Sequence, residues 1–210
     1  MNGNVQSHYT TPSEITTPTP TNKQRSSPCS SDPQQVHTII NQTPSQKRKS
    51  TTIVGDSMIS GLESWRMGNK ENRVSSRVFP GATTIDMLDY VKPTVRRKPD
   101  NIIVHVGTND LNCDTPTRVA ENIVTLCEYI ERESPSSRIA VSGIICREDE
   151  LSGSVEPTNK VLKSFCRSRG WDFLQHKIDK SCLNSRGLHL NKKGTSVLAA
   201  ELISYIKGSN

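Results

Sequence analysis

The stretch NIIVHVGTND, residues 101–110, indicates the fold class of this chain most directly. Residues 101–106 form an apolar run that contains a single histidine, His105, and such runs are typical of parallel strands covered on both faces. Small and polar residues follow, beginning with Gly107, so the strand is expected to end there in a loop. Because it lies among Ile and Val, His105 is expected to be a hydrogen-bonded core residue rather than a catalytic group.

Segments with strand-like and helix-like patterns alternate on both sides of this stretch. The expected strands cover residues 51–55, 73–79, 101–106, 137–145 and 171–176, and the expected helices cover residues 58–69, 83–97, 115–134, 156–170 and 191–208. Pro93 is expected to bend or break the second helix. The alternation predicts an α/β sandwich of three layers, in which helices cover both faces of a five-stranded parallel sheet. The expected core positions include Trp65, Tyr129, Phe165 and Trp171.

The first 50 residues differ in composition from the rest of the chain. They are dominated by Ser, Thr, Pro, Asn and Gln, and they hold half of the 12 prolines. Such a segment has few apolar side chains to bury, so burial cannot offset the entropy lost on ordering it. We therefore expect a disordered tail over residues 1–50 and one globular domain over residues 51–210.

The charge pattern does not predict a dedicated nucleic-acid-binding module. The chain carries 27 Lys and Arg against 21 Asp and Glu, a net charge of +6. Half of that excess lies in the expected tail, and the domain charges are of mixed sign rather than clustered. The basic run at residues 47–49 is interpreted as a solvated spacer; a nuclear address or a phosphate contact is the alternative.

Targeting and metal-binding signals are also missing from the sequence. No apolar run resembles a signal peptide or reaches the length of a membrane span, so we expect an intracellular protein, cytoplasmic or nuclear. The six cysteines lack the close spacing of zinc ligands and are expected to be reduced thiols.

Small and polar residues follow three of the expected strands. Asp56 and Ser57 follow the first strand, Gly81 follows the second, and Asn109 follows the third. The carboxyl ends of parallel strands meet at one edge of a sheet, where ligands bind in such folds. A fourth segment, GLHLN, places His189 just before the last helix.

This set of residue types fits acyl transfer. A serine hydroxyl is a weak nucleophile until a base takes its proton, and His189 could be that base for Ser57. The oxyanion of a tetrahedral intermediate needs preorganised donors. The backbone N–H groups of Ser57 and Gly81 and the side-chain amide of Asn109 could supply three of them.

Simpler roles remain open for each residue taken singly. Ser57 could be a helix N-cap, and His189 an ordinary loop histidine. Asp56, Gly107 and Asp110 are expected to support the site by holding the loops around Ser57 and Asn109. No close-spaced ligand pair points to a metal site.

Together, the GDS of residues 55–57, the loop at Gly81, the GTND of residues 107–110 and the GLHLN of residues 187–191 resemble the four blocks of the SGNH (GDSL-type) hydrolase family. The resemblance covers about residues 51–205. It implies a flavodoxin-like sandwich and a serine esterase or acylhydrolase without a metal or organic cofactor. It assigns Ser57 as nucleophile, His189 as base, and Gly81 and Asn109 as oxyanion donors. The substrate would be a small acyl ester, such as an acetyl ester on a lipid or a sugar.

The sequences IIVHVGTNDL at residues 102–111 and LHLNKKG at residues 188–194, together with the polar tail, are also similar to the esterase domain in first-reading-frame proteins of LINE-type retrotransposons. This resemblance would allow nucleic-acid or membrane association of a larger parent protein. The chain itself shows no RNA-recognition or zinc-knuckle motif.

One position departs from the family pattern. The last block normally carries an aspartate three residues before the histidine, and here that position is Arg186. Without this carboxylate the imidazole lacks the family's usual orienting group. A backbone carbonyl could hold the other ring nitrogen instead, and Asp179, Asn184 and Ser185 are nearby in sequence as substitutes. Two functions therefore remain in view: an esterase with a Ser57–His189 dyad, or a binding or scaffold module that has lost its activity.

Overall fold

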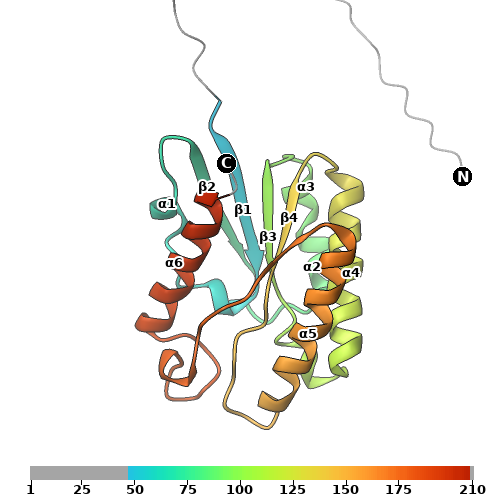
Figure 1. The fold of residues 1–210 in the computed structure, drawn as a ribbon, viewed down its shortest axis with the longest axis vertical. Helices are drawn as coiled ribbons and strands as arrows, with labels where there is room; N and C mark the ends of the chain where they lie inside the picture. Colours follow the sequence, from blue (N-terminus) through green and yellow to red (C-terminus); the bar gives the residue numbers. More distant parts are fainter. Residues whose placement is uncertain (1–46, 209–210) are drawn as a thin grey trace, which may run out of the picture. The chain divides into compact units, whose positions relative to one another are not determined.

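A five-stranded parallel sheet runs through the centre of the protein (Figure 1). The computed structural model describes residues 47–208. The strands are β1 (Lys49–Gly55), β2 (Asn72–Val78), β3 (Asn101–His105), β4 (Arg138–Ser142) and β5 (Asp172–Leu174). Their order is β2-β1-β3-β4-β5, and each neighbouring pair is parallel. This is the strand order of flavodoxin-like folds, so the predicted fold class and strand count are confirmed.

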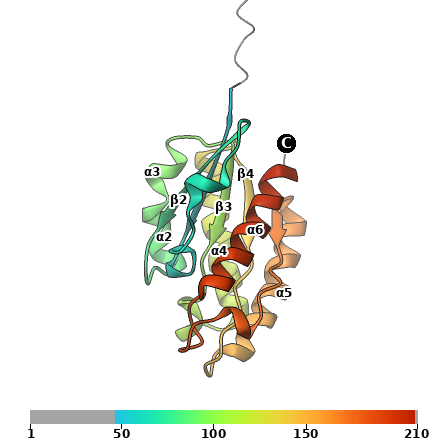
Figure 2. The same cartoon turned by 90° about the vertical axis from the view of Figure 1, so that its left-hand side faces the viewer.

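Helices form a layer on each face of the sheet (Figures 1 and 2). The first layer holds α2 (Thr84–Tyr90), α3 (Lys92–Val95), α4 (Pro116–Glu133) and α5 (Ser152–Arg169); the second holds α1 (Ser64–Met67) and α6 (Lys192–Gly208). Ile102 and Val104 pack under the first layer, and Ile103 packs under the second. Successive strand residues point to opposite faces, which explains why β3 is apolar throughout.

Pro93 interrupts the helical segment at residues 83–97, as expected. The segment is split into α2 and α3, which meet at Val91. Thr83 begins α2 with a capping box, because its hydroxyl accepts from the Asp86 N–H while the Asp86 carboxylate accepts from the Thr83 N–H.

The expected helix at residues 58–69 is wrong. The chain forms a short 3-10 helix, η1 (Ser57–Ile59), and then the four-residue helix α1. Gly61 lies between them against α6, where a Cβ would be 3.0 Å from Thr195 Oγ1. The segment therefore follows the surface of α6 rather than its own helical period.

Trp65 is also placed differently from expectation. It is 75% exposed, because α1 turns Met67 rather than Trp65 toward the core. The Arg66 guanidinium lies 5.4 Å from the centre of the indole ring. Trp171 is buried, and Tyr129 and Phe165 pack against the core as expected.

Two elements, β1 and α5, begin earlier in the sequence than expected. β1 begins at Lys49, two residues before the expected domain start, and the rest of the expected tail, residues 1–46, lies outside the described residues. Helix α5 begins at Ser152, four residues earlier than expected, so Pro157 lies inside it. Val155 is buried and holds this extra turn against the core.

Candidate active site

The turn that carries Ser57 is held by the residue before it. Asp56 Oδ1 accepts from the Met58 N–H at 2.9 Å, and the Asp56 N–H donates to the His105 carbonyl at 3.2 Å. Ser57 itself is half-buried. Its backbone N–H and its hydroxyl make no hydrogen bond to any residue between 47 and 208. The turn therefore presents two uncommitted polar groups at the end of β1.

Asp56 is a buried acid. Its side chain is 0% exposed, and within residues 47–208 its Oδ2 has no hydrogen-bond partner. Burial raises the pKa of Asp56 to about 6, the Met58 N–H opposes this shift, and the charge of Asp110 adds to it. Asp56 thus holds the turn that carries Ser57 through its bond from the Met58 N–H.

The loops after β2 and β3 meet at the same edge of the sheet. Asn109 Nδ2 donates to the Ala82 carbonyl at 2.9 Å, which holds the amide beside Gly81. Gly81 is exposed with a φ of +78°, and no hydrogen bond within the described part of the chain uses its N–H. A φ of this sign strains any residue with a side chain, so glycine is needed there. The structure thus brings Gly81 and Asn109 together.

Asp110 ties this loop to helix α2. Its Oδ1 accepts from the Thr84 N–H at 3.0 Å, and the Thr84 hydroxyl also donates to it. Burial raises the pKa of Asp110, while the bonds from Thr84 oppose the shift. Gly107 has a φ of +114°, and a Cβ there would lie 2.8 Å from Ile123 Cδ1. Asp110 thus bonds this loop to α2, and Gly107 packs closely against α4.

Arg147 is a supporting residue that the sequence did not reveal. It is buried, and its Nη1 donates to the Thr108 carbonyl at 2.7 Å. Its Nε donates to Asp149 Oδ1 at 2.7 Å, so the buried charge is paired. Thr108 lies between Gly107 and Asn109, and Arg147 therefore fixes the loop that carries the amide.

His189 is exposed on the loop between η3 (Lys180–Cys182) and α6. Its backbone carbonyl accepts from the Asn184 N–H at 2.7 Å, which closes the loop. Its ring makes no hydrogen bond to any described residue, Ser57 included. The structure therefore leaves the His189 ring exposed and without a hydrogen bond to Ser57.

The position of the expected aspartate is also solvent-facing. Arg186 is exposed, and its N–H donates to Asn184 Oδ1 at 3.1 Å. A different carboxylate lies against this loop: Glu148 donates its N–H to the Gly187 carbonyl at 3.0 Å. A Cβ on Gly187 would lie 3.2 Å from Glu148 Oε2. No spacing in the sequence links Glu148 to His189, so only the fold reveals this neighbour.

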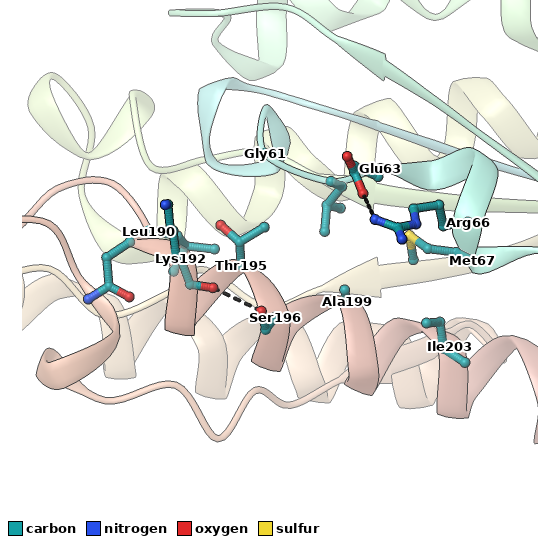
Figure 3. A pocket seen from close by; sticks show the side chains of 12 residues that line it. Gly61, Glu63, Arg66, Met67, Leu190, Lys192, Thr195, Ser196, Ala199 and Ile203 are labelled. Carbon is teal, nitrogen blue, oxygen red and sulfur yellow. Dashed lines mark hydrogen bonds and ion pairs between the residues drawn. The ribbon is translucent and has the colours of Figure 1, made fainter.

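A groove of about 630 Å³ lies between residues 61–67 and the segment that includes α6 (Figure 3). Gly61 and Leu190 both line this groove, and Leu190 directly follows His189 in the sequence. The Glu63–Arg66 ion pair lies on its upper wall in Figure 3. Its apolar surface comes from Leu62, Met67, Leu190, Ala199 and Ile203. The residues that line this groove do not include Ser57, Gly81, Asn109 or His189.

Residues 47–208 hold neither a cluster of metal ligands nor a membrane-spanning helix. Three or more His, Cys, Asp and Glu side chains do not gather there in a way that could hold a metal ion. None of the helices in that range is both long enough and apolar enough to span a bilayer.

Several solved structures share this fold. A lipase/acylhydrolase from Enterococcus faecalis superposes with a TM-score of 0.65 at 20% identity, over 77% of this chain and 96% of that one. A GDSL-like lipase from Bacteroides thetaiotaomicron gives 0.66 at 14% identity, over 77% and 89%. The esterase EstA from a Pseudoalteromonas species, in a structure inhibited by monoethylphosphonate, gives 0.63 at 14% identity, over 76% and 97%.

The family assignment follows from sequence. No curated protein matches this chain. The model of the GDSL-like lipase/acylhydrolase family matches residues 53–197, which span all four segments of the candidate site. This chain belongs to the GDSL-like lipase/acylhydrolase family.

Proposed function

We propose that the protein is a serine esterase that hydrolyses small acyl esters through Ser57 and His189. Family membership supports a hydrolase, and structural neighbours named as a lipase/acylhydrolase and an esterase support an ester substrate. The observation that carries the proposal is the set of donors at one sheet edge. The N–H groups of Ser57 and Gly81 are uncommitted in the described part of the chain, and the Asn109 amide is held beside them by the Ala82 carbonyl.

The proposed reaction has two steps. Ser57 Oγ attacks the ester carbonyl carbon while a ring nitrogen of His189 takes its proton, and the alcohol leaves with that proton. Water then attacks the acyl-serine, His189 again accepts and returns a proton, and the acid departs from a regenerated serine. In both steps the oxyanion lies among the donors from Ser57, Gly81 and Asn109, which stabilise it more than the ground-state carbonyl.

His189 must turn toward Ser57 for this chemistry. The ring is exposed and makes no hydrogen bond to any of residues 47–208, so its rotation breaks no such bond. Exposed side chains change rotamer within nanoseconds, and catalytic hydrogen bonds often tighten only when substrate binds. The acyl group would be short, such as an acetyl group on a lipid or a sugar.

The test is hydrolysis of p-nitrophenyl acetate by the full chain and by Ser57→Ala, His189→Ala and Ser60→Ala. Ser60 is an exposed serine at the end of the same turn and serves as the matched control. We expect Ser57→Ala and His189→Ala to lose activity, and Ser60→Ala to keep it. Equal rates in all four proteins would refute the proposed nucleophile and base.

A second candidate function is a binding module on the same scaffold. It is favoured by Arg186 at the usual aspartate position and by a His189 ring that makes no hydrogen bond to any of residues 47–208. An inactive wild-type chain that still binds a nonhydrolysable acetyl phosphonate, and loses that binding in Asn109→Ala, would support this function over the esterase.

A further inference from the structure

Four polar side chains form a continuous hydrogen-bonded chain between the sheet and helix α6. His105 Nδ1 lies 2.7 Å from Ser142 Oγ, and Ser142 Oγ lies 2.7 Å from His176 Nε2. His176 Nδ1 then lies 2.7 Å from Glu201 Oε2, and Glu201 Oε1 accepts from the Lys177 N–H at 2.9 Å. The chain thus joins the ends of β3 and β4, the segment after β5, and the middle of α6.

The direction of every proton in this chain follows from the groups at its ends. An ionised Glu201 only accepts, so His176 Nδ1 must carry a proton and donate to it. Burial lowers the pKa of His105 to about 3 and also lowers that of His176, while the hydrogen bond and charge of Glu201 oppose the second shift. In a neutral His176 ring whose Nδ1 carries the proton, Nε2 is an acceptor, and the single Ser142 proton points to it. Ser142 Oγ must therefore accept from the Nδ1–H of His105.

The order Ser142, His176, Glu201 has the geometry of a catalytic triad, but two observations exclude that role. Ser142 is only 2% exposed, so no substrate reaches its hydroxyl. The next two backbone donors are already used: the Gly143 N–H donates to the Leu174 carbonyl at 3.0 Å, and the Ile144 N–H donates to Asn159 Oδ1 at 2.8 Å. No oxyanion hole remains beside this serine.

The chain instead connects the two halves of the proposed esterase site. At its inner end, the His105 carbonyl accepts from the Asp56 N–H, and a Cβ on Gly55 would lie 2.3 Å from that oxygen. The Ser57 turn therefore rests directly on His105. At its outer end, Glu201 lies on α6, whose first residue follows His189 by three positions.

We propose that Ser142, His176 and Glu201 are positioning residues for the proposed reaction. They hold α6, and with it the His189 loop, in register with the Ser57 turn. This inference rests on the proposed function. Reactivity is sensitive to displacements of about 1 Å, and a chain of short hydrogen bonds in a dry interior limits such displacements.

The test compares Ser142→Ala and Glu201→Gln with Tyr205→Phe. Tyr205 also hydrogen-bonds from α6 to the β5 side, with its hydroxyl 2.7 Å from Asp172 Oδ2, but it lies outside the chain. We expect each of the first two variants to lower kcat for p-nitrophenyl acetate about tenfold with KM little changed. Tyr205→Phe should destabilise the fold without changing kcat. Equal losses of kcat in all three variants would show a general stability effect and overturn the proposal.

A spectroscopic measurement tests the hydrogen-bonded chain independently of esterase activity. In the ¹⁵N-histidine spectrum of the wild-type chain at pH 7, we expect the ring protons of His105 and His176 on Nδ1, and Ser142→Ala should shift the His105 ring signals. A His105 proton on Nε2 would overturn the proton order. A wild-type chain without hydrolysis would remove the proposed function and this role together, even if the expected ring pattern were present.

Discussion

The replacement Asp56→Asn is expected to stabilise the fold at neutral pH. Asp56 is fully buried beside the proposed nucleophile, and its Oδ2 has no partner among residues 47–208. Ionising such a group in a dry interior is costly unless the charge is paired. An asparagine keeps the oxygen that accepts from the Met58 N–H but carries no charge.

The size of the effect follows from the pKa of Asp56, which burial raises from 3.8 to about 6. The folded chain thus holds the proton more tightly than the unfolded chain does. The stability that this group contributes is fully present below pH 3.8 and is lost as the pH rises through about 6. A shift of roughly two units corresponds to ~3 kcal/mol, so Asp56→Asn should gain up to that amount over the wild type at pH 7–8. The gain should shrink steadily between pH 6 and pH 4.

Urea unfolding followed by circular dichroism at pH 4, 5, 6, 7 and 8 measures this difference. The new amide N–H₂ also has to be buried, which adds a term independent of pH, so the slope of the difference is the decisive quantity. Glu150→Gln removes one negative charge at an exposed position and is the control. A difference between Asp56→Asn and wild type that stays constant from pH 4 to pH 8 would refute the buried-charge argument.

Three further outcomes are expected. Gly107→Ala should lower the free energy of unfolding by about 2 kcal/mol or more in urea titrations, because its Cβ would lie 2.8 Å from Ile123 Cδ1 at a φ of +114°; an unchanged midpoint would contradict this. Asn109→Ala should reduce kcat for p-nitrophenyl acetate by about 10²-fold through loss of an oxyanion donor, and a change in KM alone would argue against that role. Glu148→Gln should lower kcat several-fold, because Glu148 lies against the loop that carries His189, whereas Glu150→Gln should not.

The sheet and its loops could be predicted because they depend on local patterns. The apolar run at residues 101–106 needs cover on both faces, and the alternation of strands and helices then implies a parallel sheet. Parallel strands end at one edge of the sheet, which is why the sequence alone could predict that Gly81 and Asn109 lie close together. Pro93 could be assigned to a break because its ring prevents a continuous helix at that point.

The features that could not be predicted depend on contacts between distant segments. The segment at residues 58–69 has a helical pattern, but Gly61 packs against Thr195 on α6 and the chain follows that surface instead. Nothing in the spacing of Ser142, His176 and Glu201 indicates that they share one hydrogen-bonded chain, since 59 positions separate Ser142 from Glu201. Glu148 lies beside the His189 loop only because the fold brings the segment after β4 close to Gly187.

The strand order implies that mutations in the two parts of the candidate site differ in how much folding stability they remove. β1 lies between β2 and β3, so the Ser57 turn is enclosed by the loops that carry Gly81 and Asn109, and changes there disturb the interior of the sheet. The His189 loop instead connects η3 to α6, is closed by the Asn184 N–H and is exposed to solvent at His189. A replacement at position 186, where arginine is exposed, is therefore expected to leave the fold intact. In such an arrangement a change in the His189 loop is expected to cost less folding stability than a change in the Ser57 turn.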